Sequence, residues 1–200
     1  MERLDAITRR LTEELFVEVE ASGRHVHLTK EQVQILFGHD LTPDKELSQP
    51  GQFAAKERVT VRGPKGELSR VAVLGPCRKE AQVELSLTDG RAIGITPPVR
   101  LSGEIVGTPG ATVIGPMGQV TLPQGVIAAK RHIHMTPEDA KRKNVKSGDT
   151  VKLKVLSDRP LIFEDVSVRV SPDFQTFVHI DYDEANACGF KKGDLGMILS

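Results

Sequence analysis

The 200-residue sequence carries 27 basic and 27 acidic side chains, so its formal charge is zero at pH 7. This balance argues against nucleic acid as a bulk electrostatic partner, and an aromatic content of 4% without Trp argues against base-stacking surfaces. Hydrophobic residues make up 38% of the chain, enough for a buried core, while no apolar run approaches the ~20 residues of a membrane span.

Residues 1–15 are predicted to form an amphipathic helix. Leu4, Ile7, Leu11 and Leu15 are spaced three and four residues apart, which places them on one helical face. The simpler interpretation is that this face packs on its own domain, and the alternative is that it docks on another protein. The segment lacks the apolar core of a signal peptide, so we expect a soluble intracellular protein.

From Val17 onward the sequence favours short strands separated by turn residues such as Pro50-Gly51 and Pro97-Pro98. Only two interior stretches indicate helices, Lys30–Phe37 after Thr29 and Pro137–Asn144 after Thr136. The expected strands have alternating or β-branched residues and span 17–19, 58–61, 70–74, 82–87, 150–156, 166–170 and 177–182. The pattern predicts a mainly β protein of the barrel or sandwich type.

An internal repeat refines this prediction. The segment GRHVHLTKEQ at 23–32 resembles KRHIHMTPED at 130–139, 107 residues later. A second alignment, at an offset of 95, pairs Val71 with Val166 and Val83 with Val178, and it also pairs Asp89 with Glu184, Ala92 with Ala187 and Gly94 with Gly189. We therefore expect two related small β-barrels with short capping helices.

The repeat contains residues suited to binding metal. In an extended segment the side chains of residues i and i+2 point to the same side, so His25 and His27 converge, as do His132 and His134. The second alignment places Glu84 opposite His179, and each supplies a candidate third ligand. Three ligands of this kind with an open fourth position are typical of catalytic zinc. The alternative is that these are core histidines bonded to backbone groups.

Other candidate ligands carry weaker signals. His39 stands in a polar turn and is interpreted as a surface residue, while Cys77 and Cys188 do not correspond in the repeat and are expected to be buried or partly buried free thiols. Arg78 lies six residues before Glu84, on the turn that leads into its strand. Its guanidinium is suited to binding a phosphate through two parallel hydrogen bonds, unless it is a surface arginine paired with Glu80.

Four motifs resemble those of the PduL-type phosphotransacylases, the phosphate propanoyltransferases of bacterial microcompartments. They are SGRHVHLT, LSQPGQFAAKERVTV, VLGPCRKEAQVELS and RHIHMTPEDA, and the resemblance covers about residues 16–200. It implies a phosphate acyltransferase that converts short-chain acyl-CoA and phosphate into acyl phosphate and CoA, and the sequence leaves open whether the acyl group is propanoyl or acetyl. It also implies two zinc ions, or other divalent metals, at one active site between two β-barrels.

Carried over residue by residue, the resemblance assigns one metal to His25, His27 and Glu84 and the other to His132, His134 and His179. Arg78 matches the phosphate-binding and catalytic arginine. The implied CoA contacts are Ser22, Gly23, Arg24, Lys65 and Asn186. Ala72 stands where relatives often have an arginine.

The resemblance further implies that residues 24–129 form one barrel, while residues 16–23 and 130–200 together form the other. It suggests that helix 1–15 recruits the enzyme to a shell protein, so the expected location is the bacterial cytoplasm or the microcompartment lumen. The expected partners are acyl-CoA and phosphate, without nucleic acid or membrane, and a homo-oligomer stays open.

The sequence lacks an evident Ser–His–acid or Cys–His arrangement, so direct attack of phosphate on the thioester is the expected mechanism. Two alternatives remain open at this stage. A zinc-dependent hydrolase would use the same ligands with water as the nucleophile, and a non-catalytic zinc-binding barrel module would use them structurally. Structural zinc sites are normally closed by four protein ligands, often Cys, which argues against the module.

Overall fold

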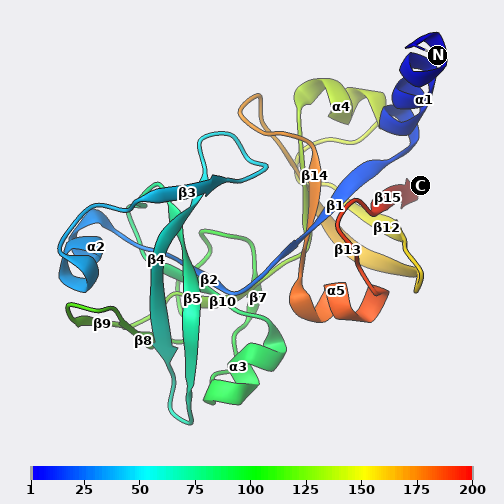
Figure 1. The fold of residues 1–200 in the computed structure, drawn as a ribbon. Helices are drawn as coiled ribbons and strands as arrows, with labels where there is room; N and C mark the ends of the chain where they lie inside the picture. Colours follow the sequence, from blue (N-terminus) through cyan, green and yellow to red (C-terminus); the bar gives the residue numbers. More distant parts are fainter. Residues whose placement is uncertain (1, 200) are drawn as a thin grey trace. The chain divides into compact units, whose positions relative to one another are not determined.

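The computed structural model describes residues 2–199, with the side chains of residues 7, 8 and 10–199. Its contacts divide the chain into two compact units (Figure 1). Unit 1 comprises the chain up to Ser22 and again from Arg131 onward, and unit 2 comprises Gly23–Lys130. Among the described residues, no helix is long and apolar enough to cross a membrane.

Unit 1 contains a closed six-stranded barrel. Around the barrel the strands are β1 (Val17–Ser22), β14 (Phe177–Asp181), β11 (His132–Met135), β13 (Leu161–Val170), β12 (Thr150–Leu156) and β15 (Leu195–Leu199). Strand β1 closes the barrel because it pairs with β14 on one side and with β15 on the other. Inward-facing residues such as Ile133, Met135, Leu153 and Val178 form its fully buried core. Two short helices, α4 (Pro137–Arg142) and α5 (Tyr182–Cys188), follow β11 and β14.

Helix α1 (Glu2–Leu15) precedes the barrel and confirms the predicted N-terminal helix. In the described part of its apolar face, Ile7, Leu11 and Leu15 are 48%, 55% and 54% exposed, so these three side chains are not buried on their own unit as the simpler interpretation required. The side chain of Leu4, the first residue of the predicted stripe, lies outside the described residues. Lys143 donates hydrogen bonds to the carbonyls of Glu13 and Glu14, which holds the last turn of the helix.

Unit 2 contains a nine-stranded sheet. Its strands follow the order β7 (Val99–Arg100), β10 (Val126–Ala129), β6 (Gln82–Glu84), β2 (His25–His27), β5 (Glu67–Gly75), β4 (Phe53–Arg62), β8 (Ala111–Ile114) and β9 (Gln119–Leu122), with β3 (Pro43–Glu46) on β4. Helices α2 (Lys30–Phe37) and α3 (Leu87–Ile93) belong to the same unit. A core of Val, Leu and Ile side chains, including Val26, Leu36, Val61 and Val83, is fully buried. The mainly β, barrel-like architecture predicted from the sequence is confirmed.

The two units repeat the same strand pairings at the predicted offsets. In unit 2, β2 pairs parallel with β5 and antiparallel with β6, and His25 lies opposite Ala72 and Glu84. In unit 1, β11 pairs parallel with β13 and antiparallel with β14, and His132 lies opposite Ser167 and His179. The internal repeat therefore reflects a duplicated three-stranded arrangement around each H-x-H segment.

Helices α3 and α5 were not expected from the sequence. The predicted strand 82–87 ends at Glu84, because Ser86 accepts a hydrogen bond from the amide of Asp89 and caps helix α3. Both helices are seven residues long and end at a glycine with positive φ, Gly94 at +77° and Gly189 at +62°. Such short helices offer too few turns for a clear apolar periodicity.

Two further expectations need correction. The helix predicted over Pro137–Asn144 ends at Arg142, and Asn144 takes up a positive φ of 53° just beyond it. Strands β3 and β7–β10 were not predicted, because they span only two to four residues in a stretch rich in Gly and Pro.

Candidate metal centres

The first cluster of candidate ligands lies in unit 2. His25 and His27 project from β2, and Glu84 lies opposite His25 on β6. One ligand atom from each residue lies within 4.8 Å of the other two, and all three side chains are buried. The carboxylate lies 3.4 Å from Nε2 of His25 and 3.9 Å from Nε2 of His27. The predicted grouping of these three residues is therefore found in the structure.

The charges in this cluster are set by burial and by the close carboxylate. Burial disfavours a charged His25, but the charge and hydrogen bond of Glu84 outweigh it and raise the pKa of His25. Burial, together with neighbouring His25 and Arg78, lowers the pKa of His27 to about 3. Burial opposes ionisation of Glu84, yet the two histidines and Arg78 hold its pKa well below the usual range. The cluster thus contains an ionised carboxylate and a neutral imidazole, the forms that ligate metal ions.

The orientation of His25 is fixed by the backbone next to it. Its Nδ1 lies 2.8 Å from the carbonyl oxygen of Gly23, and a carbonyl can only accept, so Nδ1 carries the hydrogen. The other nitrogen, Nε2, then faces Glu84. A hydrogen bond of this kind on the distant nitrogen is typical of histidines that bind metal.

The second cluster lies in unit 1 and consists of His132, His134 and His179. His132 lies opposite His179 across the β11–β14 pairing, and their ring centroids are 5.0 Å apart. The rings of His134 and His179 are 4.9 Å apart, and one nitrogen of each of the three lies within 4.8 Å of the others. Burial, with the nearby His132 and Arg169, lowers the pKa of His134 to about 3. The His134 ring is therefore neutral, and one of its two nitrogens has a free electron pair.

Unsatisfied buried nitrogens indicate that both clusters fit a metal ion. Among the described residues, Nδ1 of His27 and both ring nitrogens of His134 are buried without a hydrogen-bond partner. An orphaned buried polar atom costs about 1–3 kcal/mol, so such atoms are rare unless they bind something. One set offers two imidazoles and a carboxylate and the other offers three imidazoles, and these are nitrogen and oxygen donors of the kind zinc prefers.

Glu84 is held by a polar network that the sequence did not indicate. Gln82 donates from Nε2 to the Glu84 carboxylate at 2.5 Å and to Oγ of Ser102 at 2.8 Å. Oγ of Ser102 lies 3.2 Å from the same carboxylate and accepts a hydrogen bond from Nη1 of Arg78 at 3.0 Å. Ser102 thus joins the candidate phosphate-binding arginine to the candidate metal ligand. Its distance of 18 residues from Glu84, within a turn-rich stretch, offered no motif to find it.

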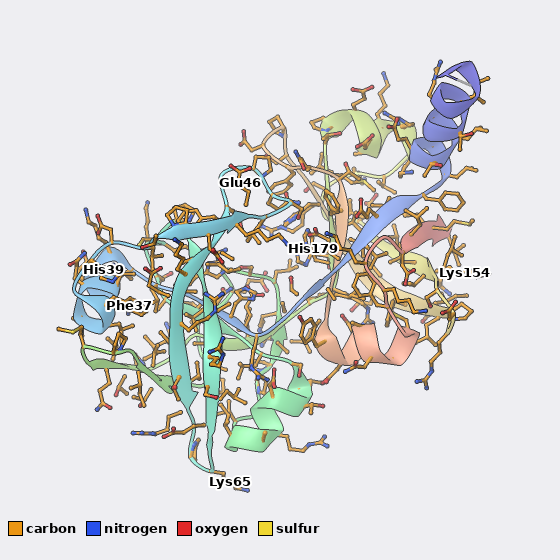
Figure 2. All side chains as sticks on the ribbon, viewed as in Figure 1. Phe37, His39, Glu46, Lys65, Lys154 and His179 are labelled. Atoms are coloured by element: carbon orange, nitrogen blue, oxygen red, sulfur yellow. The ribbon has the colours of Figure 1, made fainter. Side chains whose placement is uncertain are left out.

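Two further side chains border the unit 1 cluster and were also missed. The carboxylate of Glu20 lies 3.8 Å from Nδ1 of His179, because Glu20 is the register partner of His179 in β1 and β14. The ring of Phe174 packs on His134 with centroids 4.2 Å apart. The guanidinium carbon of Arg169 lies over the same Phe174 ring, 5.8 Å from its centroid. Figure 2 shows His179 on its strand within this unit.

The residues that the resemblance implies as CoA contacts are distributed over both units. The guanidinium of Arg24 is bonded to Asp89 at 2.8 Å, and Gly23 contributes the carbonyl that holds His25. Lys65 is exposed in the turn between β4 and β5 (Figure 2), where its stem packs beside Gly94, so it lies at the hairpin tip rather than with the ligands. In unit 1, Ser22 ends β1 and Asn186 is exposed on α5.

The remaining candidates match their predictions in part. His39 is exposed, as expected for a surface residue. Both cysteines are free, and Cys188 is buried as expected, but Cys77 is exposed because it follows Pro76 in the turn after β5. Neither cysteine belongs to a ligand cluster in the described part of the chain.

Comparison with known proteins gives one consistent family. The family model described as phosphate propanoyltransferase matches residues 18–191. Curated relatives of that name are 60% identical over 98% of this chain in Leptotrichia buccalis and 56% identical over 98% in Listeria monocytogenes, covering 94% and 93% of those proteins. A third relative, from Enterococcus faecalis, is 59% identical over 91% of this chain, and the matched region covers 87% of that relative. The chain therefore belongs to the phosphate propanoyltransferase family, a family of phosphate acyltransferases.

Proposed function

We propose that this chain transfers a short acyl group, propanoyl or acetyl, between coenzyme A and inorganic phosphate with the help of two bound zinc ions. One observation carries the proposal. A guanidinium, that of Arg78, and a buried carboxylate–imidazole cluster are joined through a single hydroxyl, that of Ser102. This places the group we assign to phosphate beside the residues we assign to metal.

Arg78 is the group we assign to phosphate. Its backbone amide donates to the carbonyl of Leu28 at 2.9 Å, which ties the turn to the residue that follows His27. The side chain is half-buried and directed toward Ser102. A guanidinium is suited to binding a phosphate through two parallel hydrogen bonds. Holding the anion in one orientation removes much of the entropy that a collision in solution would cost.

The ligands we assign to metal are His25, His27 and Glu84 for one ion, and His132, His134 and His179 for the other. When bound, a divalent ion of this kind supplies positive charge that polarises an oxygen and stabilises a developing anion. Zinc suits the donor types best, and other divalent ions with the same preference fit as well.

In the proposed reaction a phosphate oxygen attacks the thioester carbonyl carbon directly. A carbon–oxygen bond forms and the carbon–sulfur bond breaks, so CoA leaves as a thiolate and acyl phosphate is released. Arg78 stabilises the negative charge that develops on the oxygens, an effect worth about 3–4 kcal/mol for one well-placed donor. We further propose that CoA is held by residues flanking the ligand segments, namely Ser22, Gly23, Arg24, Lys65 and Asn186.

The test is the release of free CoA from propanoyl-CoA by the full chain. It is measured with and without phosphate, after treatment with a chelator, and after zinc is returned. Release that needs both phosphate and metal, together with formation of propanoyl phosphate, supports the proposal. Release that needs metal but ignores phosphate would identify a hydrolase. No release under any condition would favour a non-catalytic zinc-binding module.

We also propose that helix α1 recruits the enzyme to a microcompartment shell protein in the bacterial cytoplasm. The support is its exposed apolar stripe, since Ile7, Leu11 and Leu15 each leave about half of their surface uncovered. The test is co-purification of shell protein with the full chain and with a chain lacking residues 1–15. Equal recovery in the two preparations would refute this role.

A further inference from the structure

Each unit contains an arginine–carboxylate pair at the same place relative to its candidate ligands. In both, the arginine directly precedes the first histidine, Arg24 before His25 and Arg131 before His132. The acidic partner follows the third ligand by five residues, Asp89 after Glu84 and Glu184 after His179. The proposed function assigns no role to either pair in the metal centres.

The pair in unit 1 links three elements around the His132, His134 and His179 centre. Nη1 of Arg131 donates to Glu184 at 2.8 Å, and its Nε donates to the carbonyl of Glu164 on β13 at 2.7 Å. The same guanidinium lies 5.6 Å from the ring centroid of Phe163. The planar guanidinium of Arg131 thus bonds to both α5 and β13, and Arg131 directly precedes His132, the first candidate ligand.

The partner carboxylate completes this link to the third ligand. Glu184 uses its other oxygen to accept a hydrogen bond at 3.0 Å from the amide of Asp181, two residues after His179. Its own amide donates to the Asp181 side chain at 2.8 Å, which forms a capping box at the start of α5. A chain of bonds therefore runs from the residue before His132 to the end of the strand that carries His179.

The pair in unit 2 repeats this arrangement with a shorter acid. Nη1 of Arg24 donates to Asp89 at 2.8 Å, and the amide of Asp89 donates to Ser86, the cap residue two positions after Glu84. The Asp89 side chain is mostly buried, at 16% exposed, while that of Arg24 is 44% exposed. The same positions relative to the ligands thus carry the same chemistry in two copies whose sequences have otherwise diverged.

We propose that Arg24–Asp89 and Arg131–Glu184 are positioning pairs, each of which fixes the first histidine of its own metal centre against the third ligand. The inference rests on the proposed metal centres and adds to them four residues that do not touch the metal. Outer residues that orient metal ligands typically change metal affinity 10- to 100-fold when they are substituted. Because each pair belongs to one unit, each should affect one centre only.

The experiment measures zinc dissociation constants of the full chain by competition with a chelator. The centres are separated by His27→Ala, which removes the first, and His134→Ala, which removes the second. Arg24→Gln is measured in the His134→Ala background, where only the unit 2 centre remains, and Arg131→Gln in the His27→Ala background, where only the unit 1 centre remains. Each arginine substitution is then repeated in the other background, which reports its effect on the centre of the other unit. Glu184→Gln provides a second route to the unit 1 pair if Arg131→Gln folds poorly, and the melting temperature of the metal-free chain is recorded throughout.

We expect Arg131→Gln to weaken zinc binding about 10-fold or more at the unit 1 centre and to leave the unit 2 centre within twofold, with Arg24→Gln giving the reverse. Arg131→Lys, which keeps the charge but loses the fork, should weaken binding less than Arg131→Gln. Unchanged dissociation constants would overturn the proposal, as would equal losses at both centres or a lower melting temperature without a change in zinc affinity. If the unsubstituted chain binds no zinc, the proposed metal centres themselves fail.

Discussion

Removing the hydroxyl of Ser102 tests how the candidate phosphate-binding arginine is positioned. In Ser102→Ala the Glu84 carboxylate keeps its 2.5 Å bond from Gln82, while its contact with Ser102 was a longer 3.2 Å. Arg78 loses its 3.0 Å bond to Oγ. The loss therefore falls mainly on the guanidinium, and a hydrogen bond to a charged group contributes about 1.5–3 kcal/mol.

At about 1.4 kcal/mol for each factor of ten, this range corresponds to a fall in kcat/KM for phosphate of roughly 10- to 150-fold. The assay follows formation of acyl phosphate at varied phosphate and fixed propanoyl-CoA. The zinc content should stay that of the unsubstituted chain, and Ser102→Thr, which keeps a hydroxyl, should retain most of the activity. A kcat/KM within threefold of the original value would refute this reasoning. So would a loss of zinc as large as the loss of activity, since Ser102 would then act through Glu84.

Three further predictions concern other parts of the molecule. Arg78→Ala should lower kcat by about 10²- to 10³-fold, because it removes a donor to the developing anion, with zinc content unchanged; near-normal turnover would exclude the assigned role. His179→Ala should reduce bound zinc by one ion per chain in elemental analysis, and an unaltered content would remove His179 from the ligands. Gly75→Ala should destabilise the fold by about 1–3 kcal/mol in urea denaturation, because a Cβ there would lie 2.2 Å from the Phe53 ring; equal stability would show that the ring moves aside freely.

The candidate metal ligands were predictable because they follow local rules. Alternation along a strand brings His25 next to His27, and the duplicated sequence pairs Glu84 with His179, so five histidines and one glutamate were grouped before any coordinates. Strand patterning also predicted the strands that carry Glu84 and His179, whereas the two H-x-H segments were expected only to be extended. Helix α3 was hidden because the apolar residues just before it continued the alternation of β6.

The residues that support the ligands were not predictable in this way. Ser102 reaches Glu84 only because the chain returns 18 residues later, and Glu20 reaches His179 only through the register of β1 with β14. The repeat alignment did pair Asp89 with Glu184, but side-chain contacts were needed to connect them to the arginines before each H-x-H segment. Long-range register, rather than composition or periodicity, decided these contacts.

The closure of the unit 1 barrel sets an order for folding during protein synthesis. Strand β1 is made early, yet Leu195 and Gly196 in β15, the register partners of Glu18 and Val17, emerge almost 180 residues later. At the usual 5–20 residues per second, β1 waits roughly 10–35 s for that partner on the ribosome. Unit 2 is continuous in sequence and is fully synthesised during this interval. It therefore has its whole chain available to fold before the barrel can close, and the nascent protein carries β1 with an unpaired edge in the meantime.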